Sequence, residues 1–316
     1  MSGSISQVLR TQAFFGLSSS PRSVHNFKWW IEGGNYSFIS SPSGKVFSLS
    51  TTNPEDVIKP LCHDIARFAN SSLESITNID SDPLFPKSNG WMSIRIYYSA
   101  FFAAHSLLRI FGESCSYLNS ESVNAVNKTL RKQLPAGVPV KKGNYIIKFS
   151  KQFGGIQLDA HDIDSSHAGL WDCFYELLTN LENSISLTTL FTTEQKNDCV
   201  NFLSELKKRI SRGNNKSFLS IVRNEINYNH AMNCWSSYQP EKRSDTNNIK
   251  LSSQKWVKTC SNELFSNSTK EKVDFTETCA IIISLMKDML LELHAINKSS
   301  FLKYTTIPTL RKFIKV

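Results

Sequence analysis

Residues 91–112 read WMSIRIYYSAFFAAHSLLRIFG, an almost continuously apolar and aromatic run that ends at Gly112. The run is longer than a typical strand, and its few polar residues do not form a broad polar face. It therefore predicts a central helix that is buried on most sides. Because such a helix must be covered by other elements, this stretch sets the expected fold class, which is mainly α.

Helix-start signals on both sides of this run predict further helices. Asn53 followed by Pro54 and two acidic residues is typical of a capped first turn, and a Ser or Thr precedes two later amphipathic stretches. Helices are expected at about 54–78, 119–134, 166–185, 193–212, 216–231, 252–265 and 270–297. With short to medium connections, residues 53–297 are expected to form an up-and-down helical bundle.

The segments outside this body have a different pattern. In the N-terminal segment, residues 1–52, NYSFIS and KVFSLS alternate on either side of the turn sequence SPSG, which predicts a small β-hairpin. The stretch HNFKWWIE is a possible third strand. Within the body, residues 135–160 form a basic insertion with one possible strand, NYIIKFS. Residues 298–316 are a basic C-terminal tail.

Positive charge is concentrated in the middle of the chain. The net charge is +9, and no acidic residue occurs from Ser122 to Leu158. Solvated helix faces and loops would explain such a run, but so would a surface that follows the phosphates of RNA. The candidate RNA-binding residues are Lys128, Arg131, Lys132, Lys141, Lys142, Lys148 and Lys151.

The cysteine content and the hydropathy favour a cytoplasmic protein. The seven cysteines include no CxxC pair, which favours reduced, buried thiols. No secretory signal pattern is present, and the most apolar window, 279–293, is short and interrupted by charges. We therefore expect no membrane association.

Several common enzyme classes lack their signatures here. The chain has no GxxxxGK[ST], HExxH, GxSxG or dinucleotide-binding glycine pattern. One cluster, His161, Asp162, Asp164 and His167, has residue types that Mg²⁺ or Mn²⁺ accept, but a capped acidic loop before a helix explains it as well. We expect neither a metal nor a cofactor.

The stretch IVRNEINYNH, residues 221–230, places polar residues together on the expected 216–231 helix. Arg223 and His230 are seven residues apart, so on a helix they lie about 20° apart with about 10 Å of rise. Asn224 is next to this face and Asn227 lies one turn from each. Ordinary helix surface would also explain an Arg/His pair, because cationic residues near a helix C-terminus are favoured by the helix dipole.

These residue types suit cleavage of RNA without a metal. A histidine that titrates near neutrality can move the proton of the 2′-OH or of the leaving 5′-oxygen. An arginine stays charged and forks onto phosphate oxygens, and an asparagine can orient either group. The expected catalytic residues are Arg223, Asn224 and His230. Two copies of the helix across a two-fold axis would shorten the span between Arg and His.

Three strings resemble motifs of the HEPN superfamily. Arg223-Asn224 followed by His230 is similar to its signature of an arginine, a polar residue and a later histidine. RNEINY at 223–228 is similar to the RNxxNY string, and RIYYSAFFAA at 95–104 resembles the aromatic, alanine-rich helix of many members. The resemblance covers about residues 55–235, so the N-terminal β segment and the basic insertion lie outside it.

The resemblance implies a helical bundle, a homodimer and a metal-independent ribonuclease of the toxin, phage-defence or abortive-infection kind. It also places Arg95, Tyr98, Asn227 and Tyr228 near a possible cleft. The alternative is a non-catalytic helical module that binds a protein partner, such as an antitoxin or a sensor subunit. Its interface would then use the N-terminal hairpin, Trp29, Trp30 and the long C-terminal helices.

Overall fold

The structure is a computed structural model that describes residues 4–77, 79, 88–212, 215–229, 234–235, 243–266 and 270–314. Single 3₁₀ turns aside, its elements in chain order are α1 (Ile5–Leu9), α2 (Phe27–Gly33), β1 (Ser37–Phe38), β2 (Val46–Thr51), α3 (Glu55–Ile76), α4 (Asn89–Ile110), β3 (Glu113–Leu118), α5 (Ser120–Gln133), β4 (Gly143–Gln152), β5 (Gly155–Ile163), α6 (Ser166–Leu187), α7 (Thr193–Ile210), α8 (Phe218–Tyr228), α9 (Arg243–Ser253), α10 (Glu271–Ile296) and α11 (Thr306–Arg311).

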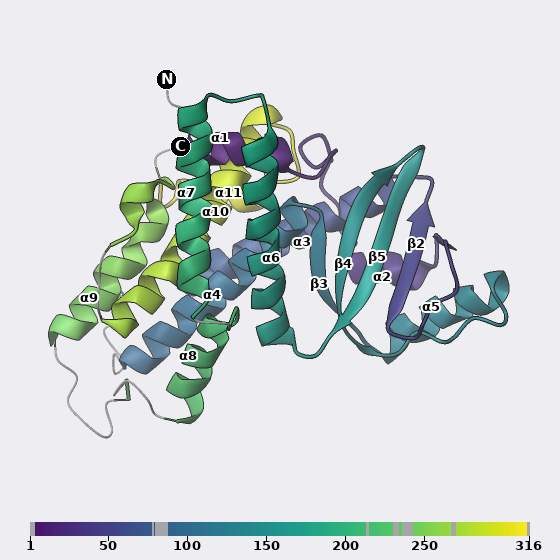
Figure 1. Ribbon diagram of the computed structural model, residues 1–316, viewed down its shortest axis with the longest axis horizontal. Coiled ribbons are helices and arrows are strands. Elements are labelled where there is room, and N and C mark those ends of the chain that lie inside the picture. The colour runs from purple at the N-terminus through teal and green to yellow at the C-terminus, as the bar shows by residue number, and fades with distance from the viewer. Residues whose placement is uncertain are drawn as a thin grey trace.

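A five-stranded antiparallel sheet stands beside the helices (Figure 1). Its strand order is β1-β2-β5-β4-β3, so the N-terminal hairpin and the expected basic insertion belong to one sheet. The expected fold class, a helical bundle with only a small hairpin, is therefore wrong, and the chain has a mixed α and β architecture. The insertion folds as the hairpin β4–β5, whose inward side chains Ile147, Leu158 and Ala160 are buried under the helices.

The N-terminal segment matches the expectation in one part and differs in another. The predicted hairpin is confirmed, with Ser37 opposite Ser50 and Phe38 opposite Leu49. The possible third strand is instead helix α2, because the Asn26 side chain accepts a hydrogen bond from Trp29 N at 2.9 Å and caps the first turn. Phe27, Trp30 and Ile31 are then one turn apart and buried together.

Helix α4 is the centre of the molecule, as residues 91–112 predict. It packs against α3 and α10 on the helical side and leads directly into β3 at the sheet. Gly112, with φ at 78°, makes the turn between the two elements, a conformation that favours glycine. Buried small residues such as Ala100, Ala103 and Ala104 let the neighbouring helices approach closely.

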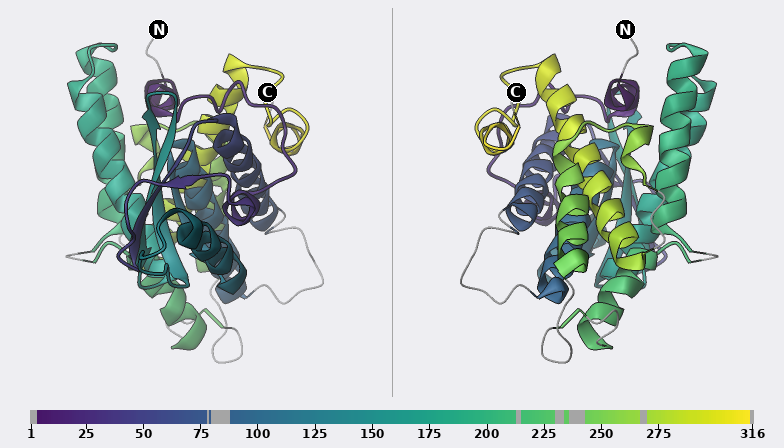
Figure 2. Two further views of the ribbon diagram at one scale, coloured as in Figure 1. Left: turned by 90° about the vertical axis from the view of Figure 1, so that its right-hand side faces the viewer. Right: turned by 90° about the vertical axis from the view of Figure 1, so that its left-hand side faces the viewer.

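The remaining helices surround α4. Helices α6 and α7 form an antiparallel pair along one side of the molecule (Figure 2). Helix α10 is buried over most of its length, and α11 from the C-terminal segment packs against α3. Within the described ranges, no helix combines the length and the apolar character needed to cross a membrane.

Candidate functional site

Helix α8 carries the candidate site and is held by α4 and α6. Its apolar side chains Leu219, Val222 and Ile226 are fully or almost fully buried, which fixes the rotation of the helix. Trp235, beyond the helix, donates from Nε1 to Ile226 O at 2.8 Å and ties the following segment back to α8. Arg223 is therefore on a helix face that its apolar neighbours have already oriented.

The Arg223 guanidinium is held by neutral oxygen atoms and by two aromatic rings. Its Nη1 donates to Asn224 Oδ1 at 2.7 Å, and its Nη2 donates to Tyr98 Oη at 2.6 Å. The guanidinium carbon lies 5.6 Å from the ring centres of both Tyr98 and Tyr228. Contacts of this kind orient a cation without neutralising it.

Among the described residues, no carboxylate lies within ion-pair distance of Arg223, and its buried Nε has no hydrogen-bond partner there. Arg209 and Arg212, in contrast, both bind acidic side chains of α10. Burial alone would lower the pKa of Arg223, but the hydrogen bond to Tyr98 and the nearby phenol groups outweigh it and raise that pKa. The site therefore presents a permanent positive charge that no carboxylate of the described residues compensates.

A second imidazole, which the sequence did not assign to the site, lies next to Tyr98. The His167 ring is edge-on to Tyr98, with ring centres 5.9 Å apart, and His167 Nδ1 lies 2.9 Å from Tyr97 Oη. Tyr97 Oη also accepts a hydrogen bond from Trp171 Nε1 at 3.1 Å. Burial lowers the pKa of His167, and the charge of Arg223 lowers it further, so this imidazole is neutral near pH 7.

No protein-family model, curated protein or solved structure matches the chain. The similarity to the HEPN superfamily rests on the sequence strings alone, and the function must be argued from the geometry of the site.

The other expected site residues occupy different places. Helix α8 ends at Tyr228, not at residue 231, so helical spacing does not fix the distance from Arg223 to His230. His230 itself lies outside the described residues. Arg95 points to another place, since its Nη2 donates to Thr77 O at the end of α3 at 3.0 Å. Asn227 is half-buried on α8, one turn beyond Arg223.

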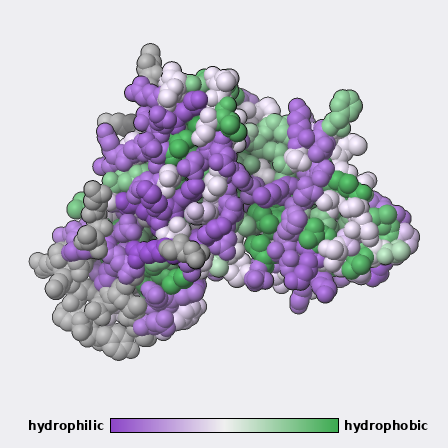
Figure 3. Space-filling view, in the orientation of Figure 1, coloured by the Kyte–Doolittle hydropathy of each residue, from purple (hydrophilic) through white to green (hydrophobic). Residues whose placement is uncertain are grey.

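The candidate RNA-binding residues do not gather around Arg223. Lys128, Arg131 and Lys132 are exposed on α5, which lies far from α8 along the long axis of the molecule (Figure 1). Lys141 and Lys142 are exposed just before β4. On the face shown in Figure 3, hydrophilic residues lie over both the helices and the sheet, with hydrophobic patches between them, so hydrophilicity does not single out the α5 surface.

The last two basic residues of this set are on β4 and already have partners. Lys148 Nζ lies 3.6 Å from Glu113 Oε1, and Lys151 Nζ lies 5.3 Å from the ring centre of Phe15. The seven residues thus form a dispersed positive surface at the sheet end of the molecule, not the wall of a cleft beside α8.

The metal-like cluster is separated by the fold. His161 is exposed on β5, Asp162 forms an ion pair with Lys45 at 2.7 Å, and His167 contacts Tyr97 within the first turn of α6. Across the described ranges, no three His, Cys, Asp or Glu side chains are grouped as metal ligands. The interpretation of residues 161–167 as the approach to a capped helix fits this arrangement, because Ser165 accepts hydrogen bonds from Ala168 N and Gly169 N.

Proposed function

We propose that the chain is a metal-independent endoribonuclease of a bacterial phage-defence or toxin system, acting in the cytoplasm. The observation that carries this proposal is the Arg223 guanidinium, which is fixed between Tyr98, Asn224 and Tyr228 and pairs with no carboxylate in the described part of the chain. The two hydrogen bonds that it makes to described residues go to neutral oxygens. A phosphate oxygen would therefore be an anionic partner that these contacts do not supply. The resemblance of residues 223–230 to the HEPN signature supports the same assignment.

In the proposed mechanism, the 2′-OH attacks the adjacent phosphorus, and Arg223 stabilises the charge on the pentacoordinate phosphorus. His230 acts as the general acid or base, and Asn224 orients the guanidinium through its 2.7 Å hydrogen bond. The expected products are a 2′,3′-cyclic phosphate and a free 5′-hydroxyl. The positive surface of α5 and β4 attracts the RNA backbone over a longer range.

The test is cleavage of labelled transfer RNA and mixed cellular RNA in the presence of EDTA. Wild type is expected to cleave, whereas Arg223→Ala and His230→Ala are expected to lose at least about 100-fold in rate, the size of a lost oxyanion contact. Arg95→Ala is the matched control, because this arginine is exposed on α4 and bonded to Thr77 O. Equal cleavage by wild type and both variants would contradict the proposed chemistry.

The alternative, a module that binds a protein partner, keeps part of its proposed interface. Trp29 is 51% exposed, and its ring stacks on His25, with the ring centres 3.8 Å apart. Trp30 and most of α10, however, are buried in the core and are not available to a partner. Absence of cleavage in every RNA tested, together with salt-independent capture of a protein partner, would favour this alternative.

A further inference from the structure

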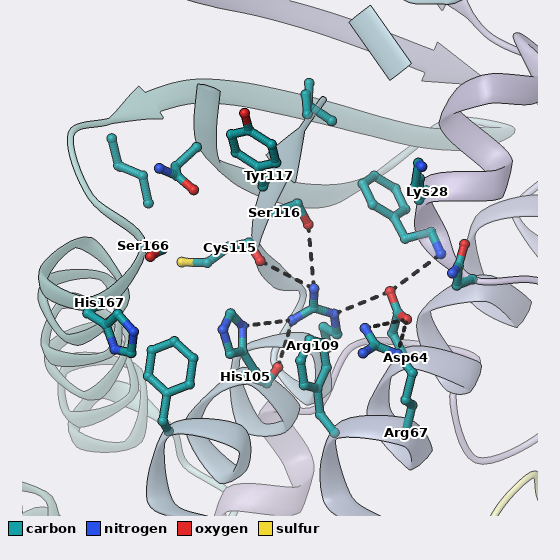
Figure 4. A pocket seen from close by; sticks show the side chains of 17 residues that line it. Lys28, Asp64, Arg67, His105, Arg109, Cys115, Ser116, Tyr117, Ser166 and His167 are labelled. Carbon is teal, nitrogen blue, oxygen red and sulfur yellow. Dashed lines mark hydrogen bonds and ion pairs between the residues drawn. The ribbon is translucent and has the colours of Figure 1, made fainter. Parts of the chain in front are cut away.

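A cavity of about 520 Å³ opens beside the edge strand β3 (Figure 4). Helices α2, α3, α4 and α6 form its other sides, and it lies on the sheet side of His167. Small-molecule sites typically enclose about 300–1,000 Å³, so the cavity has room for one nucleotide-sized ligand. Helix α8 contributes no side chain to its lining.

Flat rings form the walls of this cavity. The His105 ring stacks on Phe68, with centres 4.6 Å apart and planes 10° apart, and it meets the edge of Phe101 at 4.8 Å. Tyr117 on β3 is 58% exposed and also lines the cavity. The Phe68 ring is also covered by the guanidinium carbons of Arg67 and Arg109, which lie 4.1 and 4.5 Å from its centre. The exposed Tyr117 ring is therefore the wall on which a planar ligand can stack, and such stacking stabilises a base by about 1–3 kcal/mol.

The charges around the cavity leave an excess of positive charge. Asp64 is the one carboxylate among the described residues that line it, and it pairs with two arginines. Arg109, which is buried, has Nε 3.7 Å from Asp64 Oδ2, and the half-exposed Arg67 has Nη2 3.2 Å from Asp64 Oδ1. Lys28 also lines the cavity, but its ammonium group pairs with Glu32 and Glu121 outside the lining. The two guanidinium groups and the one carboxylate that remain leave a net charge of about +1. The Nη1 group of Arg67 has no partner among the described residues, so it can bind an anion at the opening of the cavity.

Arg109 also has an unused donor. Its buried Nε forms no hydrogen bond among the described residues, although Nη1 donates to His105 O at 2.9 Å. Nη1 also approaches His105 Nδ1 at 3.4 Å, and a guanidinium can only donate, so Nδ1 must be unprotonated. Burial, followed by the charges of Arg109 and Arg67, lowers the pKa of His105 well below its ordinary value. The cavity wall thus contains a neutral imidazole held by a buried cation.

Neutral polar groups complete the lining. They are the hydroxyls of Ser116 and Ser166, the amide of Asn144 and the imidazole of His167. Donors and acceptors of this kind suit the edges of a heterocyclic base, which presents both.

We propose that this cavity binds one nucleotide, with its base against the exposed Tyr117 ring and its phosphate at Arg67. The inference does not rest on the proposed nuclease activity, because binding can be measured without cleavage. The nucleotide has two possible sources, a free nucleoside monophosphate or one nucleotide of an RNA strand. If the ligand is part of an RNA strand, a dinucleotide should bind more tightly than a monophosphate. If the ligand is a free nucleotide, the second nucleotide should add no affinity.

The experiment is titration calorimetry of the full chain with the four ribonucleoside 5′-monophosphates and with inorganic phosphate. At least one monophosphate is expected to bind once per chain and more tightly than inorganic phosphate. Arg67→Gln and Tyr117→Ala should each weaken that binding by about tenfold, the effect of losing one charged or stacking contact. The two side chains are 49% and 58% exposed, so these variants should fold. Arg22→Gln, an exposed arginine outside the cavity, should bind as wild type does.

A dinucleotide titrated into Arg223→Ala distinguishes the two sources, since this variant should not cleave it. Affinity about tenfold above that of the monophosphate, and lost in Arg67→Gln, assigns the cavity to a nucleotide of an RNA strand. Equal affinity for the two ligands assigns it to a free nucleotide. Three results would overturn the proposal: no saturable binding, binding that both cavity variants leave unchanged, or equal binding of inorganic phosphate.

Discussion

At the scale of single residues, Arg223 differs from the other buried or half-buried arginines in the partners it has. Arg109 and Arg209 contact carboxylates, and their charges stabilise the fold. Arg223 is held by a phenol and an amide, which fix its direction but leave its charge available. A cation that is positioned in advance does not need to reorganise when charge develops on a substrate. Its position is therefore better explained by ligand binding than by stability.

The hydroxyl of Tyr98 is predicted to position Arg223. In Tyr98→Phe, the ring remains beneath the guanidinium, but the 2.6 Å hydrogen bond from Nη2 is lost. We expect kcat for RNA cleavage to fall about tenfold, equivalent to ~1.4 kcal/mol, with little change in KM. A purely structural role would instead lower the melting temperature and leave the kcat of the folded protein unchanged. Arg95→Ala is again the control.

His105 is predicted to make stability depend on pH. Its imidazole is neutral in the folded protein because burial and the charges of Arg109 and Arg67 hold its pKa well below 6.5. Once unfolded, it regains an ordinary pKa near 6.5, so at lower pH the unfolded chain binds a proton that the native chain does not. The free energy of unfolding should therefore fall as the pH drops below about 6.5, by at most ~1.4 kcal/mol per pH unit from this group.

Urea unfolding at pH values from 7 to 5 tests this dependence. His105→Gln should show a shallower loss of stability over that range than wild type, whatever its stability at pH 7. His161→Gln, on the exposed face of β5, should keep the wild-type slope. Equal slopes for all three proteins would show that His105 does not cause the acid sensitivity.

At the scale of elements, capping and periodicity predict the long helices well. The expected Ser or Thr caps of α6 and α7 are Ser165 and Thr192, whose side chains accept hydrogen bonds from the first turns. The strand β5 could not be placed from the sequence. Ile156, Leu158 and Ala160 do alternate with polar residues, and β4 next to them in the chain is one partner, but the second partner, β2, lies far earlier in the chain. Its polar ladder residue Asp159 accepts a hydrogen bond from Ser48, a contact that only the tertiary fold creates.

The start of α4 is predicted to hold α8 in place through Trp235. A Cβ at Gly90 would lie 2.8 Å from the Trp235 ring, and Trp235 is bonded to Ile226 O of α8. Gly90→Ala should therefore displace Trp235 and destabilise the protein by ~1–3 kcal/mol, and it should also reduce cleavage. Gly33→Ala in α2 is the matched control, because no atom lies within 4 Å of its new Cβ. It should be neutral or slightly stabilising, as measured by thermal unfolding.

At the scale of the whole molecule, α4 connects the two parts of the fold. Its face toward α8 contains Tyr98, which binds Arg223, whereas His105 and Arg109, farther along the helix, line the cavity beside β3. His167 contacts Tyr97 on one side and the cavity on the other, so the two proposed sites share a wall. The sequence identified Arg223 and Tyr98 through local strings. The cavity could not be predicted from it, because its lining comes from elements distant in sequence.

The last prediction concerns the assembly. If each site takes Arg223 from one protomer and His230 from its partner, mixing the two inactive variants should restore activity. Heterodimers of Arg223→Ala and His230→Ala would each contain one intact site out of two. With random exchange half of the dimers are mixed, so the mixture should recover about a quarter of the wild-type rate.

Sedimentation must first show that the chain is a dimer and that its protomers exchange. A dimer that exchanges but recovers no cleavage would place both residues within one protomer, and a chain that stays monomeric while cleaving RNA would exclude a shared site. The matched control mixes Arg223→Ala with Arg223→Ala/His230→Ala, a pair in which no combination of protomers contains an intact arginine. Because this control keeps the same exchange and the same concentrations, any recovery specific to the first mixture must come from sites that both protomers build.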